Sequence, residues 1–224
     1  LYTLRLEKAE VLTLPELEIQ FMDVVGSEIE FASTIHYDNQ LNFWKAYLEG
    51  IPELLDLPTV NLRKRIQSYE GKTFEFTLEP NLVNRLKEIS SQENTSLFVT
   101  LLAAFKILLT KYSNQDDITV GILHANREHQ AIQDIIGFFV KTLPIRTKLT
   151  NDSTFRKVIN NISRDFTSIL KHKDISFYDI ANATNTSRVS SHNPIFQVLF
   201  SYENIPNVEL KLGNLSTTVE RLSG

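Results

Sequence analysis

Five histidines are the side chains of this sequence best suited to acid–base chemistry or metal binding, because imidazole titrates near neutral pH and is a common metal ligand. They are His36, His124, His129, His172 and His192. None stands in an HExxH or another paired ligand spacing, and five residues of separation do not place His124 and His129 on one helix face. The chain has no cysteine, which excludes thiolate nucleophiles and cysteine-bound metals. We therefore expect loop histidines and no metal site.

The motifs that depend on glycine are also missing. Seven glycines are present, and none forms a GxSxG elbow, a phosphate loop or a GxGxxG turn. The acidic pair Asp116 and Asp117 precedes a strand pattern, but an acid–base pair needs two distinct environments to separate its pKa values. We interpret this pair as a turn.

Glycine and polar residues interrupt three apolar segments: Gly121 in TVGIL, Gly137 in IIGFFVKT, and residues 193–201 in NPIFQVLFS. Alternate residues of a strand share a face, which places Gln197 on a mostly apolar face. Such a glutamine either bonds to neighbouring backbone or forms the polar wall of a channel. Gly137 likewise marks either a bulge or the close approach of a substrate. Both pairs of alternatives stay open.

Helical and strand patterns alternate along the chain, and these elements must position the residues above. Helices are expected over 39–48, from Pro80, over 96–112 as a buried helix, and from a Ser153 cap to Lys171. Strands are expected over 72–78, 118–123, 138–149, 196–202 and 216–222, and Pro144 indicates an edge or a bulge. An extended connector covers 51–68. The predicted fold class is α/β, a two-layer sandwich of a mixed β-sheet covered by helices.

The overall composition is that of a globular protein. The chain has 224 residues, 42% of them hydrophobic, and a net charge of −4. This excludes a disordered chain and gives no basic surface for nucleic acid or an anionic membrane. The start of the chain lacks the pattern of a signal peptide, and its most apolar stretch, 97–109, is too short to span a bilayer. We expect a cytoplasmic protein with neither nucleic acid nor membrane as a partner.

Three segments resemble the signature motifs of the condensation domains of nonribosomal peptide synthetases. IGFFVKTLPIR (136–146) is similar to GxFVNTxxxR, HKDISFYDI (172–180) to HQDxPFExL, and SRVSSHNPIFQVLFSYEN (187–204) to RDxSRNPLFQVxFxxQN. NFWKAYLEG and LLDLP resemble earlier family text, so the likeness covers nearly the whole chain. This chain departs from the family at five positions, Lys141 for Asn, Lys173 for Gln, Ser176 for Pro, Tyr178 for Glu and His192 for Arg.

The family's catalytic HHxxxDG motif has no counterpart, because this sequence contains no adjacent pair of histidines. The resemblance therefore implies that residues 1–224 are the carboxy-terminal lobe of a chloramphenicol-acetyltransferase-like domain and carry no catalytic residue. Residues 1–70 would form lead-in helices and a connector. Residues 71–224 would form the α/β core with a floor loop and a latch.

In this family a tunnel runs between two lobes, and the resemblance assigns two sets of residues. On the tunnel or substrate side it places Gly137, Phe139, Lys141, Thr142, Arg146, Asn193, Gln197 and Ser201. As structural motif residues it gives Trp44, Gly121, Arg127, His172, Asp174, Phe177 and Pro194.

The implied reaction joins a carrier-bound donor acyl thioester to a carrier-bound acceptor amine. No cofactor would bind directly, and the phosphopantetheine arms of the carriers would tether the substrates. The implied partners are the upstream lobe, the donor and acceptor peptidyl carrier proteins and an adenylation domain. Alone, the chain is expected to be inactive. Two alternatives are a catalytically inactive module that only binds carrier proteins, and a lobe of an epimerization, heterocyclization or terminal cyclizing relative.

Overall fold

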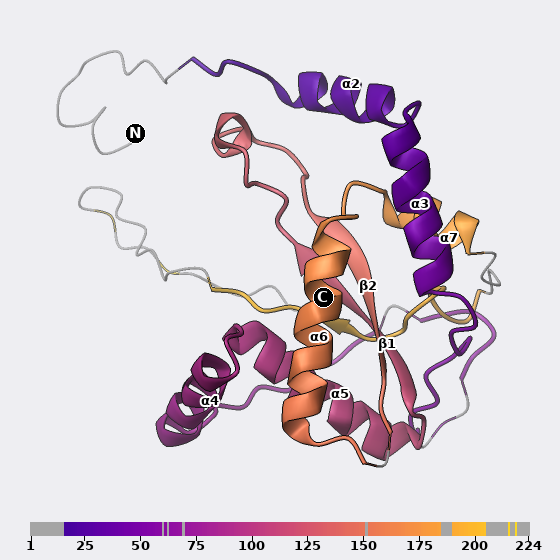
Figure 1. Cartoon of the computed structure of the whole chain (residues 1–224), viewed down its shortest axis with the longest axis vertical. Helices are drawn as coiled ribbons and strands as arrows, with labels where there is room; N and C mark the ends of the chain where they lie inside the picture. Colours follow the sequence, from indigo (N-terminus) through magenta and orange to yellow (C-terminus); the bar gives the residue numbers. More distant parts are fainter. Residues whose placement is uncertain are drawn as a thin grey trace.

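The computed structural model describes residues 16–59, 61, 63–68, 70–150, 152–184, 190–204, 215 and 218 (Figure 1). Its helices are α2 (Phe21–Phe31), α3 (Ile35–Tyr47), α4 (Pro80–Gln92), α5 (Leu97–Ser113), the 3-10 turn η1 (Gln130–Ile132), α6 (Phe155–Leu170) and α7 (Phe177–Ala183). Its strands are β1 (Asp117–His124), β2 (Lys141–Lys148) and β3 (Leu199–Phe200).

The three strands form one mixed sheet in the order β2-β1-β3. β1 pairs with β2 in antiparallel register from Asp117 opposite Lys148 to His124 opposite Lys141, and it pairs with β3 in parallel. Pro144 lies opposite Gly121 on β2, the outer strand of the described sheet, where its missing N–H costs no ladder bond. The predicted α/β class with a mixed sheet is confirmed, and so is the edge position of Pro144.

The core lies between this sheet and the helix pair α5 and α6, which pack against each other and against β1 and β2 (Figure 1). β1 contributes Ile118, Val120 and Ile122, all 0% exposed. Alternation along a strand turns these three side chains to one face. The predicted burial of the helix over 96–112 is confirmed, because Leu102 and Ala103 of α5 are also fully buried.

Side-chain caps fix where these two helices begin. The Ser96 hydroxyl accepts a hydrogen bond from the Val99 N–H at 3.3 Å at the start of α5. The predicted cap of α6 was wrong by one residue, since Thr154 accepts from the Lys157 N–H. The Ser153 hydroxyl instead accepts from the Thr150 N–H at 3.1 Å and closes the preceding turn.

The outer edge of β2 is closed by a tyrosine from the end of α3. Tyr47 Oη accepts from the Arg146 N–H at 2.8 Å and donates to the Arg146 carbonyl at 3.0 Å. One hydroxyl thus supplies the two bonds that a further strand would make at this position. Burial raises the pKa of the Tyr47 hydroxyl well above its ordinary value, so the phenol keeps the proton that it donates.

Four elements differ from the sequence prediction. The segment 72–78 forms no strand, and Phe74 and Phe76 are 86% and 74% exposed. Its alternation has no strand beside it in the described sheet, and a strand exists only through a partner's ladder of bonds. The strands expected over 138–149 and 196–202 are shorter, and of the strand expected over 216–222 only residue 218 is described. Helices α2 and α7 were not predicted.

Gly121 lies where β1 passes close to another segment, because a Cβ at this residue would overlap the ring of buried Phe196. We expect Gly121→Ala to lower the free energy of unfolding by about 1–3 kcal/mol, the usual effect of overpacking a core. Urea denaturation measures the change. Gly71→Ala is the matched control, since no atom lies within 4 Å of its Cβ position. Equal effects of the two substitutions would contradict the packing role of Gly121.

Candidate functional site

The loop between β1 and β2, residues 125–140, extends beyond the sheet (Figure 1) and folds around Arg127. Arg127 Nη1 donates to the carbonyls of Ile132, Gln133 and Ile135 at 2.8, 3.1 and 2.9 Å. Its Nη2 donates to the Gly137 carbonyl at 3.1 Å, and the guanidinium lies 4.3 Å from the centre of the Phe139 ring. A planar cation with five donors suits this shell of carbonyls and an aromatic face.

Helix α2 packs against the base of this loop. Phe21 meets Phe139 edge-on with ring centroids 5.3 Å apart, and Lys141 Nζ pairs with Glu28 Oε1 at 2.6 Å. A Cβ at Gly137 would overlap the Phe21 ring. The close approach at Gly137 is therefore made by a side chain of the same chain, which the sequence reading did not foresee.

The side chains next to Gly137 face outward. Ile136 is 96% exposed and Phe138 is 80% exposed, whereas Phe139 is buried. Large apolar side chains are seldom left this exposed side by side on a surface that meets only water. The tip of the loop thus presents two apolar groups on a backbone that Arg127 holds.

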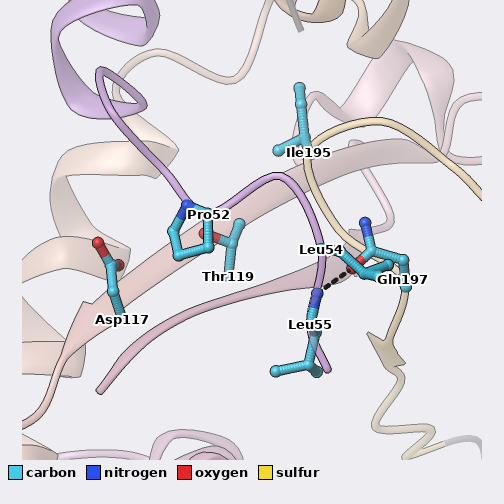
Figure 2. Close-up of a pocket in the computed structure, with 7 residues that line it drawn as sticks. All are labelled: Pro52, Leu54, Leu55, Asp117, Thr119, Ile195 and Gln197. Carbon is cyan, nitrogen blue, oxygen red and sulfur yellow. Dashed lines mark hydrogen bonds between the residues drawn. The ribbon is translucent and has the colours of Figure 1, made fainter. Parts of the chain in front are cut away.

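Gln197 joins two segments that are far apart in the sequence (Figure 2). Its Oε1 accepts from the Leu55 N–H at 2.7 Å, and its Nε2 donates to the Asn193 carbonyl at 3.0 Å and to the Glu53 carbonyl at 3.4 Å. Of the two roles left open for this side chain, bonding to nearby backbone is the one that the structure displays. Gln197 thereby fixes the segment 193–197 against the connector.

A small crevice lies beside Gln197, with a volume of about 10 Å³. It is lined by Pro52, Leu54, Leu55, Asp117, Thr119, Ile195 and Gln197 (Figure 2). Thr119 Oγ1 is buried and has no hydrogen-bond partner within the described part of the chain. A space of this size holds about one water molecule, which suits that orphan hydroxyl but cannot admit a substrate.

Arg146 lies at the end of α3 and is fully engaged. Its Nη2 and Nε bond to the Asp117 carboxylate at 2.6 and 2.9 Å, and its Nη1 donates to the carbonyls of Tyr47 and Glu49 at 3.2 and 2.8 Å. The hydrogen bond with Asp117 raises the pKa of Arg146 further. A cation that bonds the last carbonyls of a helix also meets the negative end of its dipole.

The remaining residues assigned to the tunnel side are more dispersed. Thr142 lies on β2 opposite Leu123, Asn193 is exposed and uses its carbonyl, and Ser201 is exposed just after β3. The structure brings Gly137, Phe139 and Lys141 together around α2 and Arg127. It groups Asn193 with Gln197, and it places Arg146 in a separate ion pair.

The assigned structural residues form two clusters. Trp44 is fully buried and donates from Nε1 to the His172 carbonyl at 2.8 Å, and the His172 ring stacks on Phe43 at 3.8 Å. Nearby, the Asp174 carboxylate accepts from Gln40 Nε2 at 3.0 Å. The second cluster is the ring of Phe196 between Gly121 and Phe177, with the Pro194 carbonyl bonded to the Phe196 N–H at 2.7 Å.

Sequence reasoning missed several partners in these contacts, Phe21, Glu28, Tyr47 and Asp117. Asp117 was interpreted as part of a turn. With the register known, Thr119 faces Arg146, so Asp117 is its diagonal neighbour on the same face of the sheet. An acidic residue two positions before the partner of an arginine is the signal that would have revealed the ion pair.

In the described ranges, no group of three or more His, Asp or Glu side chains is arranged to hold a metal ion. Over the same residues, no single helix is long and apolar enough to cross a membrane. Only α4 and α5 taken together meet that test, with a bend of 107° between them.

The chain was then compared with known proteins. The family model described as Condensation domain matches residues 2–221. The chain belongs to this condensation domain family. It is 38% identical to a linear gramicidin synthase of Brevibacillus parabrevis over 199 residues, which cover 89% of this chain and 4% of that protein. The resemblance inferred from the motifs is confirmed.

Solved condensation-type structures share the fold. A four-domain nonribosomal peptide synthetase bound to AMP and glycine superposes with a TM-score of 0.79 at 24% identity, covering 89% of this chain and 15% of that one. The X-domain from teicoplanin biosynthesis gives a TM-score of 0.78 at 25% identity, covering 85% and 44%. The condensation domain fold of the chain is thus established, and the chain spans less than half the length of each of these proteins.

Proposed function

We propose that this chain is the carboxy-terminal lobe of a peptide-bond-forming condensation domain in a nonribosomal peptide synthetase. The family match and the relative that is 38% identical support this assignment. Residues 1–70 serve as lead-in and connector, and residues 71–224 form the core. The sequence has no adjacent pair of histidines, so the proposal assigns the catalytic histidine motif to the partner lobe.

In the proposed reaction, the amine of an acceptor aminoacyl thioester attacks the carbonyl carbon of a donor thioester. A C–N bond forms, the C–S bond breaks, and the departing thiol takes up the proton that the amine loses. Phosphopantetheine arms of two peptidyl carrier proteins hold both substrates. Most of the rate then comes from alignment of the tethered reactants, which is worth effective molarities of about 10⁵ M or more in favourable cases.

The role of this lobe is to build one wall of the tunnel and to meet the carrier proteins. The loop wound around Arg127 is the observation that carries this proposal, because it holds the family motif on a protruding backbone with Ile136 and Phe138 exposed. We place Thr142, Asn193 and Ser201 along the same wall. In this proposal the protein works in the cytoplasm beside an adenylation domain.

Mass spectrometry of peptide bond formation between two loaded carrier proteins tests the proposal. The chain is compared with a version extended upstream through the histidine motif. We expect amide product only from the extended protein, at the mass of a simple condensation. Turnover by residues 1–224 alone would contradict the lobe assignment.

The same assay separates the alternatives. A product lighter by one further water would indicate a heterocyclizing relative, and an inverted stereocentre without a new amide would indicate an epimerization domain. Two inactive proteins that still bind carrier proteins would indicate a recruitment module.

A further inference from the structure

Lys173 reaches across the fold to the start of the β1–β2 loop. It lies in the turn after α6, and its Nζ donates to Asn126 Oδ1 at 3.0 Å and to Glu128 Oε2 at 2.6 Å. The Lys173 side chain is 19% exposed, so its ammonium is largely shielded from water. Asn126 and Glu128 are the two neighbours of Arg127. One ammonium group therefore holds the chain on both sides of the arginine that organises the loop.

The backbone at this point adopts an unusual conformation that needs support. Asn126 has a φ of 54°, in the left-handed region that asparagine tolerates better than most residues. Its N–H donates to His124 Nδ1 at 3.2 Å, and His124 Nε2 lies 3.2 Å from Glu128 Oε1. With Lys173, these contacts form a closed ring of four side chains around the start of the loop.

The charges in this ring support its hydrogen bonds. The Lys173 hydrogen bond lowers the pKa of Glu128, and burial lowers the pKa of His124. At neutral pH the glutamate is ionised and the imidazole is neutral. Nδ1 then accepts from the Asn126 N–H while Nε2 donates to the carboxylate, which matches the observed distances.

The effect of this ring continues into the loop through Arg127. The direction in which the Arg127 side chain leaves the backbone is set by residues 126 and 128. Arg127 in turn bonds to four carbonyls between Ile132 and Gly137 and lies over Phe139. The exposed Ile136 and Phe138 belong to that same stretch. The contacts are continuous from the turn after α6 to the tip of the loop.

We propose that Lys173 is a positioning residue that fixes the start of the β1–β2 loop and thereby orders residues 130–140. Its importance for amide formation rests on the proposed function. The positioning of the loop is a property of this chain alone and can be measured separately. Glutamine, the usual residue of the family at this position, has no charge to hold Glu128.

Hydrogen exchange followed by mass spectrometry, on the full chain, tests the positioning. We expect Lys173→Met to speed amide exchange in residues 130–140 by roughly tenfold, the factor that corresponds to one charge-assisted hydrogen bond. Lys173→Arg retains the charge and several donors and should restore slow exchange, and Lys173→Gln should fall between. Peptides from α5 serve as the internal control and should not change in any variant. Should Lys173→Met be too unstable to study, Glu128→Gln removes the other charge and should give the same local effect.

Two results would overturn the inference: unchanged exchange in residues 130–140 of Lys173→Met, or fast exchange in Lys173→Arg despite a preserved fold. Amide formation by the intact synthetase then tests the link to function. We expect Lys173→Met to slow it and Lys173→Arg to restore it. An ordinary rate in a variant with a loosened loop would refute the functional link. A wild-type synthetase that forms no amide would refute the proposed function and leave the exchange result standing.

Discussion

Replacement of Arg146 by methionine is expected to lower the free energy of unfolding by about 3–5 kcal/mol, because removal of one partner leaves a desolvated charge behind. The Arg146 and Asp117 side chains are only 10% and 15% exposed. The same change removes the donors that bond the Tyr47 and Glu49 carbonyls at the end of α3. Urea denaturation at neutral pH measures the loss.

Asp117→Asn and the double variant complete the test of Arg146. If the ion pair carries the effect, the double variant loses less stability than the sum of the two single variants. A contrary result is equally informative. Arg146→Met with unchanged stability and lost amide formation would indicate that Arg146 faces the substrate rather than the fold.

Lys106 is expected to make the stability of this protein depend strongly on pH. The side chain is 0% exposed on α5, and its Nζ donates to the carbonyls of Ile118 and Ile145 at 3.1 and 2.6 Å and to Thr147 Oγ1 at 2.8 Å. Burial lowers the pKa of Lys106 from 10.5 to about 7, although the charges of Asp165 and Asp117 oppose the shift. The native state therefore releases this proton well before the unfolded chain does.

The direction of the effect follows from linkage. Between pH 7 and pH 10.5 the unfolded chain binds more proton than the native state, so this group makes stability rise with pH. Compared with Lys106→Met, the wild-type chain should gain about 2 kcal/mol from pH 7 to pH 9, at about 1.4 kcal/mol per pKa unit. Denaturation of both proteins at several pH values measures the difference. A constant difference would show that Lys106 titrates as an exposed lysine does.

Methionine is a suitable probe because it fills a similar volume and orphans no strand carbonyl. Arg146 turns its N–H and C=O away from β1 toward Tyr47. Bonded and non-bonded pairs alternate in an antiparallel ladder, so the adjacent pairs Ile118–Thr147 and Val120–Ile145 exchange the ladder bonds. Lys106 therefore uses the second lone pairs of carbonyls that already have partners. Lys106→Ala, in contrast, adds a cavity and should be destabilising at every pH.

The sequence predicted elements whose signals are local. The helices α3, α4, α5 and α6 have helical spacing of apolar residues together with caps or a starting proline, and all four are present. Helix α2 escaped prediction because it buries none of its residues and begins at Gln20, which is not a typical cap. The segment 72–78 misled for the opposite reason. Its alternation is a local property, whereas a strand requires a partner.

The site was predictable only in part for the same reason. The motif 136–146 could be recognised from its letters, and Gln197 was correctly singled out as a polar group that needs bonds. The side chains that hold them, Phe21, Glu53 and Asp117, lie 29 or more residues away in the chain and in elements whose packing no local pattern reveals. Arg146 was assigned to a tunnel, and its contacts with Asp117 emerge only from the register of β1 and β2.

The hydroxyl of Tyr47 also bears on how this protein behaves at high concentration. An open sheet edge is a template on which a second copy can add a strand, which leads to aggregation or fibrils. Along β2, Pro144 has no N–H, and the Arg146 backbone is already occupied by Tyr47 Oη. A single oxygen atom therefore protects the chain from self-association. Its loss in Tyr47→Phe would first become visible as turbidity rather than as a lower melting temperature.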